Sequence, residues 1–235
     1  MSIWSRIGKA IAALAKGESL SHVFERLRTP PERSVAFTIA VIALGAKMAK
    51  ADGRVTRDEV TAFRQVFVIP KDAEAQAARV FNLARQDVTG YDAYARSVAR
   101  MFRDNPAVLE DLLEGLFFIA TADGEFHPKE REFLKNVADI FGIGERCFRS
   151  LQTRYAPGAP QDAYAVLGVD PDTPIDEIRR IWREKVRETH PDRMLARGVP
   201  EEAIKLATAR LVALNRAWED IAARHTARDK ADLSP

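Results

Sequence analysis

The sequence predicts an all-helical protein of two modules joined by a short linker. Its composition favours helix, because Ala, Arg and Glu are abundant and aromatic residues make up only 8% of the chain. Apolar residues recur at helical spacing over residues 34–154, and again over residues 161–227. Residues 155–160 contain two prolines and a glycine, which discourage regular structure. We therefore predict an N-terminal module over 34–154, a linker over 155–160 and a C-terminal module over 161–227.

Charge and cysteine content narrow the class of protein. With 36 Lys and Arg against 34 Asp and Glu, the formal net charge is +2, so any electrostatic recognition of a partner must be local. Nucleic acid is not an expected partner on this ground. The single cysteine, Cys147, excludes an intramolecular disulfide and a zinc site built of cysteines. It fits a small core residue in a reducing compartment, and we expect a cytoplasmic protein.

Residues 1–33 precede the N-terminal module and begin with a predicted amphipathic helix. Apolar residues fall on one face of that helix: Ile3, Trp4, Ile7, Ile11 and Leu14. Basic residues lie elsewhere on residues 3–16, so the helix either docks on its own chain or a partner, or lies peripherally on the inner, anionic face of a membrane. The longest apolar stretch, residues 35–46, is shorter than the roughly 18 to 20 residues of a membrane span. We expect it to be a buried core helix, and we expect no membrane anchor.

The N-terminal module contains an internal repeat. The sequence Ala-Asp-Gly at residues 51–53 recurs at residues 122–124, each time after an apolar helical stretch. A glutamate follows at the same distance in both copies, and a second amphipathic helix comes after it. Because Asp-Gly permits the left-handed backbone that ends a helix, each copy predicts a helix, a turn and a helix.

The acidic residues of the repeat allow two interpretations. Local chemistry explains them without a ligand, since Thr56 with Glu59 forms a capping box and Pro128 suits the first position of a helix. In the other interpretation the two turns approach one another and offer a divalent cation four carboxylate ligands: Asp52, Glu59, Asp123 and Glu130. Both interpretations stay open, and we expect no other cofactor.

The duplicated Ala-Asp-Gly turn, with a Glu seven positions after each Asp, resembles the TerB-like domain of tellurite-resistance and DjlA-type proteins. The resemblance covers about half of the chain. It implies a helical bundle and, in some members of the family, metal binding through acidic residues.

The C-terminal module begins with a short helix over residues 162–169, which Gly168 closes. A long helix follows Pro174, and its apolar stripe lies at Ile178, Trp182 and Val186. Beside the stripe runs a basic flank made of Arg179, Arg180, Arg183 and Arg187. A third helix is predicted from about Pro200, with apolar residues at Ala207, Leu211, Leu214, Trp218 and Ile221. The two long helices form an antiparallel hairpin, and residues 228–235 form a tail.

A loop of about ten residues, 190–199, joins the two long helices in this prediction. Its first residues are His190, Pro191 and Asp192, which therefore lie at the tip of the hairpin. Four elements then occur in the order of a J-domain: Tyr164 with residues 167–169, the basic helix, His190-Pro191-Asp192, and residues 215–219. The loop at 193–200 resembles the DjlA type in particular.

This resemblance implies a co-chaperone that stimulates ATP hydrolysis by a DnaK-type chaperone and performs no chemistry itself. The residues that it implies for chaperone contact are Arg179, Arg183, Arg187, His190, Pro191, Asp192 and Arg193. Glu184 departs from the pattern, since many J-domains carry a base there, and we expect it to weaken the contact. The N-terminal module would then act as an adaptor for an unknown client or for location.

Three other functions are compatible with parts of the sequence. An enzyme could use His190 and Asp192 as an acid-base pair, but a loop tip offers no nucleophile or oxyanion donors. A nucleic-acid interface could use the basic helix, but Glu184 and Glu188 interrupt the positive face. In the remaining alternative, the N-terminal module is a metal- or stress-sensing adaptor and the J-domain is its effector arm. The sequence does not indicate the oligomeric state.

Overall fold

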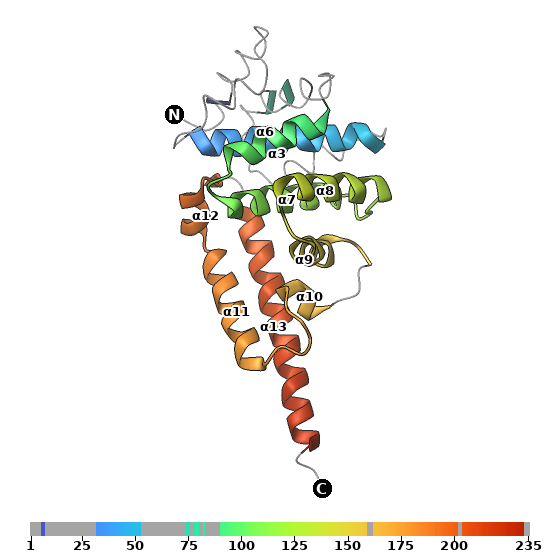
Figure 1. Ribbon diagram of the computed structural model, residues 1–235, viewed down its shortest axis with the longest axis vertical. Coiled ribbons are helices and arrows are strands. Elements are labelled where there is room, and N and C mark those ends of the chain that lie inside the picture. Colours follow the sequence, from blue (N-terminus) through green and yellow to red (C-terminus); the bar gives the residue numbers. More distant parts are fainter. Residues whose placement is uncertain are drawn as a thin grey trace.

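The computed structural model describes residues 6–7, 32–52, 74–75, 78–79, 82, 90–158, 162–201 and 204–232. Every regular element within these ranges is a helix, which confirms the all-helical fold class (Figure 1). The helices are α3 (Glu32–Asp52), α6 (Tyr91–Met101), α7 (Pro106–Ala120), α8 (Pro128–Phe141), α9 (Glu145–Tyr155), α10 (Ala163–Leu167), α11 (Ile175–Glu188), α12 (Pro191–Arg197) and α13 (Ile204–Asp232).

The N-terminal module is a bundle in which α3 and α6 lie over α7 and α8, with α9 below them (Figure 1). Its core is large and apolar, and the fully buried Phe37, Phe117 and Phe148 come from three different helices. Residues 35–46, predicted as a buried core helix, lie inside α3 and are almost completely excluded from solvent. Burial of these side chains provides the main stabilisation of the bundle.

The second copy of the repeat has the predicted helix, turn and helix. Helix α7 ends at Ala120, and the chain then turns through Gly124, whose φ of +86° favours glycine. Helix α8 begins at Pro128, and a Glu130 carboxylate oxygen accepts a hydrogen bond of 2.9 Å from the His127 backbone N–H. In the first copy, α3 ends at Asp52, and residues 53–73 lie outside the described residues.

The C-terminal module contains the predicted short helix and hairpin. The Asp162 side chain caps α10 by accepting from the Tyr164 and Ala165 backbone N–H groups, and Gly168 closes the helix at φ +65°. Helices α11 and α13 pack together around a small core that includes Ile178, Leu214 and Ile221. Helix α13 begins at Ile204, later than Pro200, and it continues through the predicted tail to Asp232.

The predicted ten-residue loop is wrong, because residues 191–197 of it form helix α12. The fixed φ of Pro191 suits the first position of a helix, and this residue begins α12. His190 is the N-cap of α12, and its Nδ1 accepts a hydrogen bond from the Asp192 backbone N–H at 3.2 Å. Gly198 closes the helix at φ +98°. The residues predicted as a loop therefore contain an N-cap (His190), a proline at the first helical position and a glycine that ends the helix.

The two modules pack against each other, although the sequence predicted only a linker between them. Ser150 of α9 donates a hydrogen bond of 2.7 Å to the Val166 carbonyl, and Arg146 pairs with Asp170 at 3.0 Å. Four buried residues of the C-terminal module belong to the core of the N-terminal module: Met194, Val199, Leu206 and Ala207. Helix α12 and the first turns of α13 therefore rest on the N-terminal module.

Candidate functional site

His190, Pro191 and Asp192 form an exposed corner between α11 and α12, which we call the His-Pro-Asp corner. Helix α11 ends at Glu188, and the buried Thr189 donates its hydroxyl to the Lys185 carbonyl at 2.8 Å. The side chains of His190 and Asp192 are 61% and 86% exposed. Because Nδ1 of His190 accepts the Asp192 N–H, a neutral ring carries its proton on Nε2. The corner thus presents a ring N–H donor and a carboxylate acceptor to solvent.

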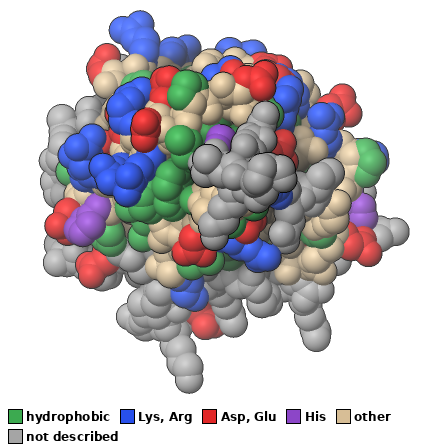
Figure 2. All heavy atoms as spheres, turned by 90° about the horizontal axis from the view of Figure 1, so that it is seen from below, with side chains coloured by type: hydrophobic (Ala, Val, Ile, Leu, Met, Phe, Trp, Pro, Cys, Tyr) green, Lys and Arg blue, Asp and Glu red, His purple; other side chains and the backbone are tan. Residues whose placement is uncertain are grey.

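A row of three exposed arginines runs along α11 beside the corner. These are Arg179, Arg183 and Arg187, which we call the basic face. None of the three makes an ion pair with another described residue, whereas Arg180 pairs with Glu177 at 3.5 Å and with Glu184 at 3.7 Å. Figure 2 shows Lys and Arg side chains gathered on the side of the molecule where α11 lies. Three guanidinium groups are therefore open to an acidic partner.

Arg193, the remaining residue that the resemblance implied, differs from the basic face. It lies on α12 and pairs with the Glu188 carboxylate at the end of α11. Arg193 therefore lies next to the His-Pro-Asp corner, but its guanidinium group is already paired with Glu188.

Two tryptophans hold α11 on α13 behind the basic face. The rings of Trp182 and Trp218 stack with centroids 5.2 Å apart, and the Trp182 Nε1 donates to the Asn215 side chain at 3.1 Å. A half-buried indole needs such a partner for its N–H. The stack fixes the helix that carries the arginines.

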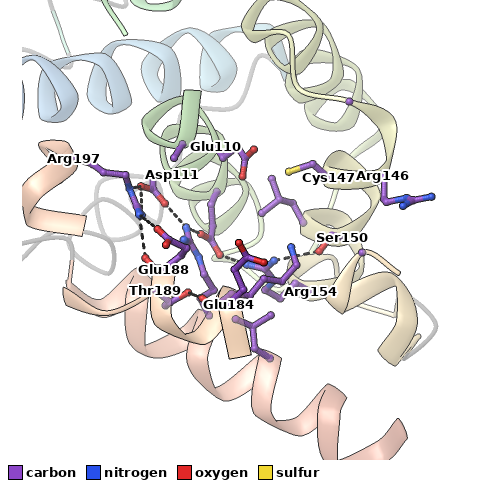
Figure 3. A pocket seen from close by; sticks show the side chains of 18 residues that line it. Glu110, Asp111, Arg146, Cys147, Ser150, Arg154, Glu184, Glu188, Thr189 and Arg197 are labelled. Atoms are coloured by element: carbon purple, nitrogen blue, oxygen red, sulfur yellow. Dashed lines mark hydrogen bonds and ion pairs between the residues drawn. The ribbon is translucent and has the colours of Figure 1, made fainter. Parts of the chain in front are cut away.

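A cluster of five charged side chains at the module boundary went unnoticed in the sequence. Asp111 and Glu114 of α7 are each 1% exposed. Their partners are the guanidinium groups of Arg154, Arg197 and Arg210. All five side chains line a cleft of about 480 Å³ between the modules. Figure 3 labels Asp111, Arg154 and Arg197 of this group. Two acids three residues apart inside an apolar helix were the available signal, because such acids are rarely buried without a charged partner.

Comparison with known proteins places these features in a family. The model of the tellurite resistance protein TerB matches residues 38–153. The co-chaperone protein DjlA of Coxiella burnetii is 30% identical over 194 residues, which cover 74% of this chain and 72% of that protein. The chain belongs to the DjlA family of co-chaperones. The DjlA protein of Photobacterium profundum is 29% identical, and the match covers 81% of this chain and 78% of that protein. The DjlA protein of Escherichia coli K12 is 25% identical, and the match covers 93% of this chain and 97% of that protein. No solved structure matches significantly.

Membership in the DjlA family identifies the N-terminal module as its TerB-like domain and the C-terminal module as its J-domain. In the described half of the predicted metal site, Asp123 accepts the Glu125 backbone N–H at 2.9 Å and Glu130 accepts that of His127. No three potential ligands lie together among the residues that the structure describes. Glu59 and the side chain of Asp52 lie outside those residues, so metal binding stays a prediction.

The predicted N-terminal amphipathic helix of this DjlA-family chain is described only at Arg6 and Ile7. Ile7 is fully buried and belongs to the core of the TerB-like domain. This observation favours docking on the chain itself over the membrane interpretation. Among the described helices, none is long and apolar enough to cross a membrane.

Cys147 lies on α9 beside the cleft and is expected to react slowly in the folded protein. Burial, together with the nearby Glu110 carboxylate, raises the pKa of its thiol from 9.0 to about 11. At pH 8 the thiolate fraction is then about a hundredfold smaller than for an unperturbed thiol, and alkylation by iodoacetamide should slow by a similar factor. The rate measured on the same protein in urea is the control. Equal rates in the folded and unfolded chain would contradict the assignment.

Proposed function

We propose that this chain stimulates ATP hydrolysis by a DnaK-type chaperone through the His-Pro-Asp corner and the basic face. The observation that carries the proposal is their joint exposure. The corner points a ring N–H and a carboxylate outward, and beside it lie three arginines that form no ion pair within the described part of the chain. An arginine already paired within its own chain would have to lose that pair before binding, and the basic face bears no such cost.

The stimulation would arise from binding, without chemistry on the chain itself. The basic face would meet an acidic surface of the chaperone, and complementary charge would speed the encounter. His190 and Asp192 would then hydrogen-bond to groups that are correctly placed only in the hydrolysis-competent state of the chaperone. A ligand that prefers one state shifts the population toward it, and the hydrolysis rate rises accordingly.

The TerB-like domain would act as the adaptor that brings this activity to a client or to a location in the cell. A lone half-buried cysteine fits a reducing compartment, and we place the activity in the cytoplasm. Residues 3–16 would allow peripheral contact with the inner face of the membrane if Ile7 leaves the core in which it is buried.

The test is single-turnover ATP hydrolysis by the cognate DnaK with His190→Gln in the full chain. We expect the stimulation to fall at least about tenfold, within the ordinary range of coupling between two binding events. Glutamine retains a hydrogen-bonding group but cannot reproduce both ring nitrogens in one rigid plane.

His225→Gln is the matched control, because it makes the same substitution on α13, away from the corner. It should stimulate as the wild type does, and both variants should keep the wild-type circular dichroism spectrum. Wild-type stimulation by His190→Gln would refute the proposed function.

A further inference from the structure

Helix α12 carries the His-Pro-Asp corner at its start, yet its apolar side packs on the other domain. Met194 is 3% exposed and Val199 is 2% exposed, and both belong to the core of the TerB-like domain. Neither belongs to the separate core between α11 and α13. The next turn continues this contact, since the Leu206 Cδ1 lies beside Gly115 of α7. Helix α12 therefore contacts the TerB-like domain as well as α13 of its own module.

Arg197, the last residue of α12, joins three elements through one guanidinium group. Its Nη1 donates to the Glu188 backbone carbonyl at 3.1 Å, which braces the end of α11 against α12. Its Nε and Nη2 donate to one carboxylate oxygen of Asp111 on α7, at 3.2 and 2.9 Å. Figure 3 shows these interactions reaching from Arg197 toward both domains. The planar fork of arginine can hold such a set together, whereas a lysine ammonium cannot.

Asp111 is itself held in place by a second contact, so it can fix the position of Arg197. Its second oxygen accepts a hydrogen bond of 2.6 Å from Arg210, which also pairs with Glu114. A carboxylate with 1% exposure has little contact with water, so losing a hydrogen-bond partner is costly. The angle between α11 and α12 is thus tied to a side chain of the TerB-like domain about eighty residues earlier in the chain.

This docking leaves the chaperone-contact groups uncovered. His190 and Asp192 stay exposed, and the basic face lies on the open side of α11. The contact therefore orients the corner without blocking it.

We propose that Asp111 is a positioning residue, through which the TerB-like domain sets the orientation of the His-Pro-Asp corner by way of Arg197. The inference rests on the proposed function, since orientation matters only if the corner binds a chaperone. Asp111 does not contact the basic face, so initial binding of the chaperone does not depend on Asp111. The productive arrangement of His190 and Asp192 does depend on Asp111.

The experiment uses the full chain with Asp111→Asn and, separately, Arg197→Lys. Single-turnover hydrolysis by the cognate DnaK is measured over a range of co-chaperone concentrations. Both variants should lower the maximal stimulation about fivefold or more, while the half-saturating concentration changes by less than about twofold. Arg146→Lys is the control, because it alters another contact between the domains, with Asp170, and leaves α12 alone. It should behave as the wild type does.

Amide hydrogen exchange gives a readout that needs no chaperone. Asp111→Asn should speed exchange in residues 191–197 at least about tenfold relative to wild type, with α8 unchanged. Unchanged exchange in α12, or a change in the half-saturating concentration alone, would overturn the positioning role. Faster exchange in a chain whose wild type fails to stimulate DnaK would refute the proposed function and leave the structural contact standing. Arg197→Lys keeps the buried charge and serves if Asp111→Asn fails to fold.

Discussion

Replacing Glu114 by alanine is expected to lower the free energy of unfolding by about 3 to 5 kcal/mol. The Glu114 carboxylate accepts from Arg154, from Arg210 and from the Tyr155 hydroxyl, which lies at 2.7 Å. Alanine would remove the carboxylate partner of Arg154 and the acceptor of the Tyr155 hydroxyl, and it would leave Arg210 paired with Asp111 alone. Burying unpaired charge costs more free energy than the intact cluster contributes. Urea unfolding followed by circular dichroism measures the change.

Glu132→Ala on α8 is the control for this substitution. Its carboxylate is exposed and makes no ion pair with another described residue, so the free energy of unfolding should change by less than about 0.5 kcal/mol. Glu114→Gln should fall between the two, because an amide oxygen still accepts hydrogen bonds but carries no charge. Equal unfolding midpoints for Glu114→Ala and Glu132→Ala would contradict the structural account of the cluster.

Most of the helices could be predicted because their causes are local. Gly168 ends α10 for the reason seen in the sequence, the left-handed backbone that a helix stop requires. The turn at Gly124 and the cap at Glu130 follow from residues within four positions of each other. The signals for α12 are local as well, but a proline can either end one helix or begin the next, and the sequence does not decide between these roles. The structure shows that α11 ends at Glu188 and that Pro191 begins α12.

The contacts between the domains could not be predicted, because no local rule names a partner far away in the chain. Asp111 and Glu114 are visibly unusual in the apolar α7, but more than thirty Lys and Arg residues were available to pair with them. Arg197 lies 86 positions after Asp111, and Arg210 lies 96 positions after Glu114. The basic face is a different case, because the partners of Arg180 are local: Glu177 and Glu184 lie three and four residues away. The sequence shows four arginines on one flank, and the structure shows which of them is paired.

This difference among the arginines predicts the second large effect. Arg183→Gln is expected to raise the half-saturating concentration for stimulation of DnaK about tenfold, the equivalent of one charge-assisted hydrogen bond worth about 1.5 kcal/mol. Maximal stimulation should stay within about twofold of wild type, since the His-Pro-Asp corner is unchanged. The loss should shrink as salt rises from 50 to 300 mM, roughly the range over which mobile ions screen exposed charges. Single-turnover hydrolysis at each salt concentration provides the measurement.

Two controls separate an open arginine from charge in general. Arg224→Gln removes the same charge from an exposed position on α13 and should leave the half-saturating concentration unchanged. The double variant Arg180→Gln with Glu184→Gln removes a neighbouring ion pair without changing the net charge. The opposite charges of Arg180 and Glu184 largely cancel each other at a bound chaperone, so the half-saturating concentration should change by less than about twofold. If the double variant weakens stimulation as much as Arg183→Gln, the chaperone reads the whole flank, and the internal pairing of Arg180 does not decide which arginines it contacts.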